Sequence, residues 1–419
     1  MVYRHNFSYD SKTNKGIYLD YAATTPVASE VMKAMMPYFS EKYGNPSSVH
    51  YFGQQAMAAV DESREIVAKA IGLSAVNDFR SVIFTGSATE ANNLALRGVV
   101  KFSDKILKPK IIVSTIEHES VLRTVKDLEK AGVEIEYLPV DDKGFVQIEK
   151  LKKVLDKKTV LVSIMYANNE IGTVQPIKKI SKIIKDWKLE NNPDSIYPLF
   201  HTDAVQAFQY LNCNVFDLGV DLMTLSAHKI YGPKGIGALY INNKDSSNFK
   251  ILPLITGGHQ EFDLRAGTEN VAAIVGFAKA VELAVLLRKK ETERISKLAV
   301  YFWRELKKIY SKVEINGVDL EKTDFLKTED YISLRLPNIL NIYFPNYSAE
   351  DLLIKFDMAQ IAVSAGSACL SRFSKPSPVL QALGLPLQRI KSSLRFSFGR
   401  FTTKEEIVNV LKKIKNILK

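Results

Sequence analysis

The stretch DLMTLSAHKIYGPKGIGALYI, residues 221–241, decides the fold class of this chain. Two apolar runs, 221–225 and 236–241, are typical of strands, and a loop of glycines and small residues joins them. Outward from this stretch, strand-like runs alternate with segments of 3.6-residue periodicity. The strand-like runs cover 81–85, 111–115, 133–140, 160–165 and 197–202, and the helical segments include 56–71, 90–100 and 121–131. This alternation predicts an α/β fold with a mainly parallel sheet flanked by helices.

The pattern changes in the C-terminal third of the chain. An amphipathic stretch over 271–310 predicts a long helix that leads out of the α/β unit. New strand-like runs follow at 339–343 and 394–397, and a basic helix over 404–418 closes the sequence. The expected units are an N-terminal segment, 1–16, packed against the smaller domain; a large domain, 17–289; and a smaller α+β C-terminal domain, 290–419.

Composition and charge exclude several classes of protein. The 419 residues are 46% hydrophobic and 25% charged, which excludes a disordered or collagen-like chain. The net charge of +11 is spread along the chain, with no basic stretch interleaved with aromatics, so we expect no direct nucleic-acid binding. The longest apolar stretch, 271–287, contains Lys279 and Glu282 and is too short for a membrane span.

Two further features concern the compartment. Residues 1–15 contain no apolar core of a secretory signal. Their basic residues are compatible with a very short transit peptide, which is the alternative. The two cysteines, Cys213 and Cys369, argue for a reducing compartment and against a disulfide framework. We therefore expect the protein in the cytoplasm, with an organelle as the alternative.

Lys229 lies just past the first predicted strand of the opening stretch, in Ser226-Ala227-His228-Lys229. Small neighbours leave room for a bulky group around its amine, which suits a lysine that forms a Schiff base. The alternative is an ordinary surface lysine in a loop. The glycines that follow lack the placement of a dinucleotide-binding fingerprint.

Two more positions suit a phosphate-bearing cofactor. Asp203 ends a predicted strand, where α/β sheets bind ligands, and a carboxylate there would keep the ring nitrogen of pyridoxal phosphate protonated. Ser87 and Glu90 have capping-box spacing at a predicted strand-to-helix turn, and a free helix start binds phosphate. The alternatives are ordinary helix caps at both places. Six scattered histidines and the lack of a Cys-x-x-Cys motif predict no metal site.

Ten segments in order along the chain carry a resemblance to a known family. They are YLDYAATTPV (18–27), GNPSSVH (44–50), GSATEANNLA (86–95), EHESVL (117–122), NNEIGTVQPI (168–177), HTDAVQ (201–206), SAHKIYGPKGIGALY (226–240), RAGTEN (265–270), SAGSAC (364–369) and SLRFSFGRFTT (393–403). The sequence resembles the class V, fold-type I pyridoxal phosphate enzymes, and within them the NifS/IscS-type cysteine desulfurases. The resemblance covers nearly the whole chain and implies the fold of a fold-type I transferase.

This resemblance implies catalytic and substrate-binding roles for five residues. Lys229 would form the Schiff base with pyridoxal 5′-phosphate, and His118 would stack on the ring and assist proton transfer. Cys369 would attack the substrate sulfur. Arg395, together with Asn169, would bind the substrate carboxylate.

The resemblance also implies the rest of the cofactor site. Asp203 would pair with the ring nitrogen, while Gln206 and Asn169 would contact the hydroxyl side of the ring. The residues that would hold the phosphate are Ala88, Thr89, Ser226 and His228. Thr268 would reach the phosphate of the neighbouring subunit, so the site would require a homodimer.

The two cysteines differ in their surroundings. Cys369 lies in a stretch of Ser, Ala and Gly ahead of Pro376 and Pro378, and such residues favour a mobile loop rather than a packed core. A free thiol is mostly protonated near pH 7, so this cysteine requires activation at the site. The alternative, a buried small hydrophobe, fits Cys213 better because its context is more apolar.

The chain departs from the family at two places. The family's GGGQERG is GGHQEFD here, at 257–263, so its arginine is absent and the role of that loop is open. The extended C-terminal tail with which IscS docks on its scaffold is missing after Lys419. The sequence therefore does not identify the assembly partner, whereas the expected reaction is unaffected.

These observations predict an L-cysteine desulfurase that forms L-alanine and a persulfide on Cys369. The sulfur would pass to an acceptor such as an iron–sulfur scaffold or a tRNA-thiolation protein. One alternative is an aminotransferase or a selenocysteine lyase of the same family, although an aminotransferase needs no cysteine in a mobile loop. Another is a non-catalytic sulfur-assembly subunit, but binding alone would not require Lys229, Asp203 and Arg395 together.

Overall fold

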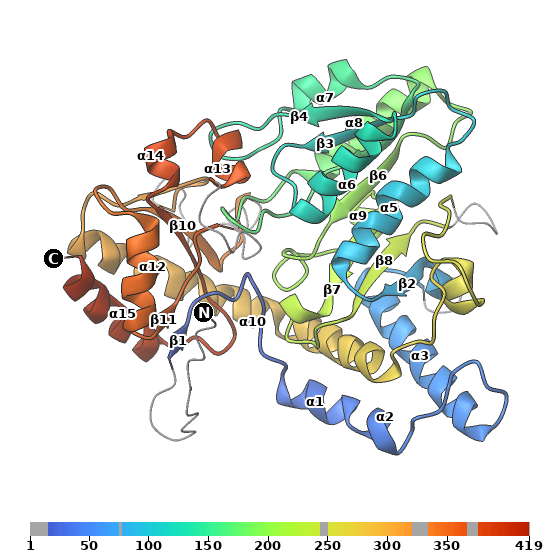
Figure 1. The fold of residues 1–419 in the computed structure, drawn as a ribbon, viewed down its shortest axis with the longest axis horizontal. Helices are drawn as coiled ribbons and strands as arrows, with labels where there is room; N and C mark the ends of the chain where they lie inside the picture. The colour runs from blue at the N-terminus through green and yellow to red at the C-terminus, as the bar shows by residue number, and fades with distance from the viewer. Residues whose placement is uncertain (1–15, 75–77, 244–249, 321–333, 367–375, 419) are drawn as a thin grey trace, which may run out of the picture.

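A seven-stranded sheet forms the centre of the large part of the molecule (Figure 1). The computed structural model describes residues 16–74, 78–243, 250–320, 334–366 and 376–418. In spatial order, the strands are β2 (Val82–Thr85), β8 (Gly237–Ile241), β7 (Leu222–Ser226), β6 (Leu199–Asp203), β5 (Thr159–Ser163), β3 (Lys110–Ser114) and β4 (Glu134–Leu138). β8 is antiparallel to both of its neighbours, and the other adjacent pairs are parallel. The prediction of a mainly parallel sheet is confirmed.

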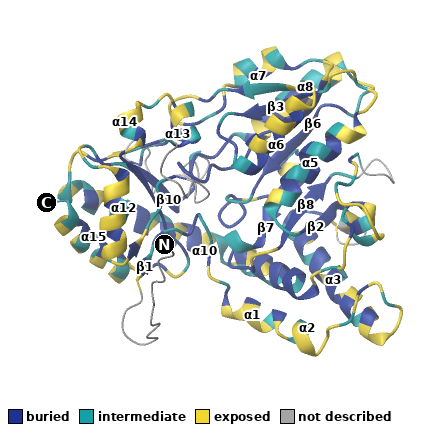
Figure 2. Cartoon of the chain, in the orientation of Figure 1, coloured by how far each residue is buried: buried dark blue, intermediate teal, exposed yellow. Residues whose placement is uncertain are grey.

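The strands inside this sheet are buried on both faces, which explains their continuous apolar runs (Figure 2). Successive side chains enter different cores, because Ile111 packs in one cluster and Ile112 in the other. The edge strand β4 is the exception, since Glu134 and Glu136 make it partly polar. Charged residues at a sheet edge discourage pairing with another chain.

Helices cover both faces of the sheet (Figure 1). On one face, α5 (Ala88–Phe102) and α6 (Glu119–Lys130) share a core with Ile83. On the other face, α3 (Tyr51–Ala70), α8 (Ile177–Asn191) and α10 (Val271–Ile309) share a core with Phe84. The short helices of this part are α1 (Ser29–Met35), α2 (Pro37–Ser40), α7 (Ile148–Val154) and α9 (Val215–Leu218), with single 3₁₀ turns η1 (Phe79–Ser81), η2 (Ala227–Lys229) and η3 (Gln260–Asp263).

A second core lies beside the sheet and is built mainly from the C-terminal part of the chain (Figure 1). A small antiparallel sheet has the order β12 (Ser393–Ser397), β10 (Ile339–Tyr343) and β9 (Glu314–Ile315). Next to it, β1 (Ile17–Tyr18) pairs in parallel with β11 (Ile361–Ala362). The remaining helices are α12 (Ala349–Met358), α13 (Pro378–Ala382), α14 (Leu387–Ile390) and α15 (Lys404–Ile417).

The helix α10 connects the two cores. Phe277 near its start packs with the large sheet, whereas Phe302 near its end packs in the second core. The boundary that we expect between residues 289 and 290 falls inside this helix, and the division into two domains stays a prediction. Residues 1–15 lie outside the described residues, and Ile17, just after them, packs in the second core. Within the described ranges, no helix combines the length and the apolarity that crossing a bilayer requires.

Candidate active site

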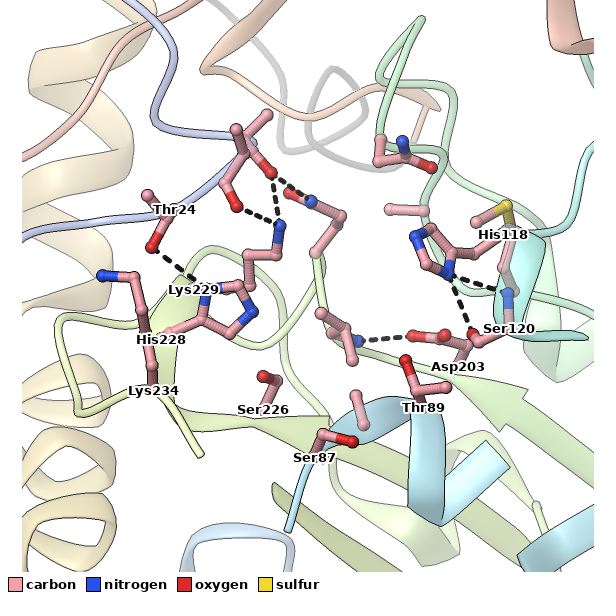
Figure 3. A pocket seen from close by; sticks show the side chains of 18 of the residues that line it. Thr24, Ser87, Thr89, His118, Ser120, Asp203, Ser226, His228, Lys229 and Lys234 are labelled. Atoms are coloured by element: carbon pink, nitrogen blue, oxygen red, sulfur yellow. Dashed lines mark hydrogen bonds between the residues drawn. The ribbon is translucent and has the colours of Figure 1, made fainter. Parts of the chain in front are cut away.

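A cavity of about 420 Å³ lies at the carboxyl ends of the parallel strands (Figure 3). Loops that follow β2, β3, β5, β6 and β7 line it, and β12 of the second core contributes one residue. The expected site residues that meet here are Ala88, Thr89, His118, Asn169, Asp203, Gln206, Ser226, His228, Lys229 and Arg395. Thr268 is exposed and lies outside this lining, and Cys369 lies outside the described residues.

Lys229 is held by the segment that follows β1. Its Nζ donates hydrogen bonds to the carbonyl oxygens of Ala22 and Ala23, each at 2.7 Å. The same segment braces the neighbouring residue, because Thr24 Oγ1 lies 3.1 Å from His228 Nδ1 and the Thr25 N–H donates to the His228 carbonyl. The sequence motif that contains these residues therefore acts through backbone carbonyls, which residue type alone could not reveal.

One end of the cavity has the features of a phosphate site. The helix α5 starts there, with Ser87 as its N-cap, so the first backbone N–H groups at Ala88 and Thr89 lack intrahelical partners. Ser226 Oγ is buried beside them and makes no hydrogen bond within the part of the chain that the structure describes. Lys234 adds a positive charge at the exposed rim. This end of the cavity therefore fits the phosphate of the implied cofactor.

The opposite side of the cavity carries a chain of hydrogen bonds that begins at Asp203. Asn92 Nδ2 donates to Asp203 Oδ2 and to Ser120 Oγ, both at 2.8 Å. Ser120 Oγ lies 2.8 Å from His118 Nδ1, and the Val205 N–H donates to the other Asp203 oxygen. The carboxylate is thus supplied with donors and suits a protonated ring nitrogen. Asn92 and Ser120 were not expected from the sequence, and the one available signal was an amide among the apolar residues of the predicted helix over 90–100, which the structure buries fully.

The two histidines of the cavity are uncharged near neutral pH. Burial lowers the pKa of His118, and the Lys229 ammonium also lowers it while Asp203 opposes the shift. Burial, with Lys229 and Lys234, lowers the pKa of His228 to about 4. Both rings can therefore act as neutral hydrogen-bonding groups, and the positive charge of the cavity comes from its lysines and its arginine.

Glu117, which precedes His118, is a buried carboxyl. Burial raises its pKa to about 8, although hydrogen bonds from Ser114 Oγ and the Met165 N–H oppose the shift. Its side chain is thus protonated near neutral pH and adds no charge beside the cavity.

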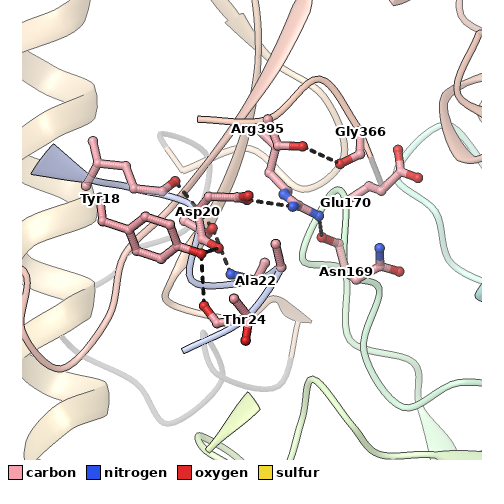
Figure 4. A network of polar contacts seen from close by, with 12 residues as sticks. Tyr18, Asp20, Ala22, Thr24, Asn169, Glu170, Gly366 and Arg395 are labelled. Carbon is pink, nitrogen blue, oxygen red and sulfur yellow. Dashed lines mark hydrogen bonds and ion pairs between the residues drawn. The ribbon is translucent and has the colours of Figure 1, made fainter. Parts of the chain in front are cut away.

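Arg395 is the residue that the second core contributes to the cavity (Figure 4). It is 1% exposed. One terminal nitrogen donates to the Asn169 carbonyl at 2.8 Å, and the other donates to Asp20 Oδ1 at 2.7 Å. Its Nε is buried and makes no hydrogen bond within the described ranges. The guanidinium therefore keeps donor capacity for a ligand carboxylate.

The altered loop, GGHQEFD, has a structural role. Glu261 forms a bidentate ion pair with Arg64, and Phe262 lies under the same guanidinium. Glu261, Phe262 and Asp263 have φ values of 46°, 58° and 66°, which non-glycine residues adopt at a cost. The buried ion pair holds this conformation. Gln260 Oε1 in turn accepts a hydrogen bond from the Gly267 N–H, so the loop positions the segment that precedes Thr268.

Cys213 has the properties expected of a core residue. It is fully buried, and burial raises the pKa of its thiol to about 12. It does not line the cavity. The interpretation of Cys213 as a packed hydrophobe is confirmed.

The described part of the chain contains no group of three or more His, Cys, Asp or Glu residues placed to hold a metal ion. The chemistry of this cavity is that of a carboxylate, an amine, a guanidinium and neutral imidazoles.

Comparison with known proteins gives matches over nearly the whole chain. The model of the family "Aminotransferase class-V" matches residues 17–410. Cysteine desulfurase IscS of Dictyoglomus turgidum is 48% identical over 402 residues, which are 96% of this chain and 94% of that protein. Cysteine desulfurase IscS of Clostridium botulinum is 42% identical over 406 residues, which are 97% of this chain and 95% of that protein.

Solved structures agree with this result. A NifS-like protein superposes with a TM-score of 0.84 and 36% identity, covering 96% of this chain and 99% of the other. SspA in complex with cysteine superposes with a TM-score of 0.74 and 33% identity, covering 92% of this chain and all of the other. These similarities extend over both cores of the molecule.

Proposed function

The chain belongs to the class-V aminotransferase family, and from this premise we propose that its cavity removes sulfur from L-cysteine with the residues assembled there. It is a pyridoxal 5′-phosphate-dependent cysteine desulfurase, an activity that leaves L-alanine. The observation that carries the proposal is the meeting of Lys229, Asp203 and Arg395 in one cavity. They supply an amine for a Schiff base, a carboxylate for a ring nitrogen and a guanidinium for the carboxylate of an amino acid.

When bound, pyridoxal 5′-phosphate supplies an aldehyde that condenses with amines and a protonated ring that withdraws electrons from the substrate. Asp203 would face the ring nitrogen, with Gln206 and Asn169 on the hydroxyl side. The start of α5, the unpartnered Ser226 hydroxyl and His228 would hold the phosphate.

Arg395 would orient the substrate by its carboxylate, because its guanidinium is buried, charged and open to the cavity. The Lys229 Nζ would move protons at the substrate carbons, a role supported by the position of this side chain in the cavity lining. His118 would lie over the ring and donate or receive hydrogen bonds from its side of the cavity.

Cys369 would take the sulfur. Its thiolate would attack the substrate sulfur, forming a sulfur–sulfur bond while the carbon–sulfur bond of the substrate breaks, and the released carbon would take a proton to become the methyl group of alanine. This role rests on the sequence around Cys369 and on the exclusion of Cys213, which is sealed in the core.

A homodimer is part of the proposal. Figure 2 shows much of α1, α2 and the start of α3 in the colour of exposed residues. The exposed residues of this region include apolar ones, with 42–66% of each accessible: Met32, Met36, Phe39, Tyr51 and Phe52. A patch of this kind on a single subunit supports association with a second copy. Thr268 is exposed and could then serve the neighbouring site.

The destination of the sulfur and the compartment belong to the same proposal. The resemblance supports an acceptor protein such as an iron–sulfur scaffold. The low count of two cysteines in 419 residues supports a reducing compartment such as the cytoplasm.

The test is to incubate the purified protein with L-cysteine, measure alanine and sulfide, and locate the transferred sulfur by mass spectrometry. We expect added sulfur on the peptide that contains Cys369. Cys369→Ser should keep the visible absorbance of the bound cofactor and lose sulfur transfer, because a hydroxyl is a poor nucleophile toward sulfur. Lys229→Ala should lose both.

Cys213→Ser is the matched control, and we expect it to retain activity with a stability loss of about 1–3 kcal/mol from burying a new hydroxyl. Sulfur on Cys213, or full activity in Cys369→Ser, would overturn the assignment. Unchanged cofactor absorbance in Lys229→Ala would overturn the role of the lysine.

A further inference from the structure

We propose that Asn92 and Ser120 are positioning residues that hold His118 in the tautomer with its proton on Nε2, so that the ring presents a hydrogen-bond donor to the cavity. Figure 3 shows His118, Ser120 and Asp203 gathered on one side of the cavity. The proposal rests on the proposed function, because it specifies what His118 contributes to that site.

A backbone hydrogen bond determines the protonation of one ring nitrogen of His118. His118 is the N-cap of the 12-residue helix α6, and its Nδ1 accepts a hydrogen bond from the Ser120 backbone N–H at 3.1 Å. A backbone N–H can only donate, so Nδ1 must carry a lone pair. In a neutral imidazole the single proton is then on Nε2.

The side chains of Asn92 and Ser120 direct a second donor at the same nitrogen. Asn92 Nδ2 lies 2.8 Å from an Asp203 oxygen, and a carboxylate only accepts, so this contact fixes the orientation of the amide. The same Nδ2 lies 2.8 Å from Ser120 Oγ, which therefore accepts from Asn92. The hydroxyl proton of Ser120 is then directed at His118 Nδ1, 2.8 Å away. Nδ1 is thus held by two donors.

The orientation of Asn92 carries a cost that supports this reading. Its Oδ1 is buried and makes no hydrogen bond within the described residues. A buried acceptor without a donor destabilises the folded state, so the two donated bonds decide how the amide sits.

The tautomer gives His118 and Lys229 different roles in the cavity. His118 Nε2, on the opposite edge of the ring, makes no hydrogen bond to any residue that the structure describes. The charged and titratable groups around the ring are Asp203 on β6, Lys229 and His228 at η2, and Glu119 on α6. A neutral ring with its proton on Nε2 donates to substrate or cofactor atoms, and proton abstraction is left to Lys229.

The direct test is ¹⁵N NMR of the histidine-labelled full chain, with and without bound pyridoxal 5′-phosphate, with His118→Gln to assign the signals. We expect the shift of an unprotonated Nδ1 and a protonated Nε2. The opposite tautomer in an active protein would overturn the inference and leave the proposed function standing. A chain with no desulfurase activity but the expected tautomer would do the reverse.

Variants test the two positioning residues. Ser120→Ala removes one donor to Nδ1 without touching Asp203, and should raise the titration midpoint of His118 by roughly 0.5 to 1 pH unit. Asn92→Leu should raise it as well, because the Ser120 hydroxyl can then rotate and accept from a protonated Nδ1. Ser120→Thr keeps the hydroxyl and should restore the midpoint.

The matched control is Asn93→Ala, the next residue on α5. The Asn93 side chain bonds the Thr89 carbonyl, Arg97 and the Thr124 hydroxyl, and it contacts neither the Ser120 hydroxyl nor His118. It should leave the midpoint unchanged. An unchanged or lower midpoint in Ser120→Ala would overturn the positioning role.

Discussion

Two buried arginines, Arg64 and Arg395, are each paired with a carboxylate, but their pairs are built differently. Arg64 and Glu261 form two parallel hydrogen bonds of 2.6 and 2.8 Å, with both side chains at most 4% exposed. Arg395 donates a single hydrogen bond to Asp20, whose side chain is 17% exposed. Its second terminal nitrogen donates to the Asn169 backbone carbonyl.

The surroundings of the two arginines also differ. The guanidinium of Arg64 lies 4.9 and 5.0 Å from the ring centroids of Phe84 and Phe262. Glu261 also accepts a hydrogen bond from the Phe84 N–H, so this pair joins β2 to the altered loop. Arg395 faces the cavity instead. We call the bidentate Arg64–Glu261 pair the closed pair, because its contacts stabilise the fold. We call the single-bonded Arg395–Asp20 pair the open pair, because its guanidinium can still bind a ligand.

The largest expected effect is on the closed pair. Arg64→Met leaves the Glu261 carboxylate buried without a counter-charge, so we expect the free energy of unfolding to fall by about 3–5 kcal/mol. Urea denaturation checks this value. Adding Glu261→Gln removes the uncompensated charge and keeps an acceptor for the Phe84 N–H, so the double variant should recover part of the loss. A loss below about 1 kcal/mol in the single variant would remove the contrast between the pairs.

The second effect is on substrate binding at the open pair. Arg395→Leu removes charge-assisted hydrogen bonds of about 1.5–3 kcal/mol, so kcat/KM for L-cysteine should fall roughly 10- to 150-fold. The same variant should bind cysteamine, which lacks the carboxylate, as the unmodified protein does. Equal losses for both ligands would show that Arg395 serves the fold, as Arg64 does.

The smallest effect distinguishes the two carboxylates. Asp20→Asn keeps an acceptor for Arg395 but removes the negative charge that competes with the substrate, so KM for L-cysteine should fall by roughly fivefold, equivalent to about 1 kcal/mol. Steady-state kinetics at low ionic strength measure it. Glu261→Gln, the same neutralisation in the closed pair, should leave KM unchanged. A higher KM in Asp20→Asn would mean that Asp20 only positions the arginine.

The large sheet was predictable because its strands are buried on both faces and read as apolar runs. In this sheet, β6 ends at Asp203, one residue past the expected strand. In the small sheet, β10 occupies residues 339–343 as expected. The two-residue strands β1 and β11 were not found, because a periodicity needs more residues than they contain. Their pairing depends on chain segments more than 340 residues apart.

In the candidate site, too, the contacts between distant segments could not be predicted from the sequence. Lys229 and Asp203 stood out because their chemistry is unusual at strand ends. Asn92 and Ser120 have ordinary residue types on helices, and their role arises only where α5 and α6 pack side by side. Asp20 lay in a motif, yet its ion pair with Arg395 joins the two ends of the sequence.

That last contact has a consequence for how the protein is made. Asp20 and Arg395 are 375 positions apart, as are the Ala22 N–H and the Ser397 hydroxyl that it contacts. A ribosome therefore releases the segment that holds Lys229 long before β12 exists, and Arg395 can reach its place only when synthesis is nearly finished. Such distant contacts slow folding and leave intermediates exposed. Once Lys229 has been made, the nascent chain thus carries it through most of the remaining synthesis without a finished site around it.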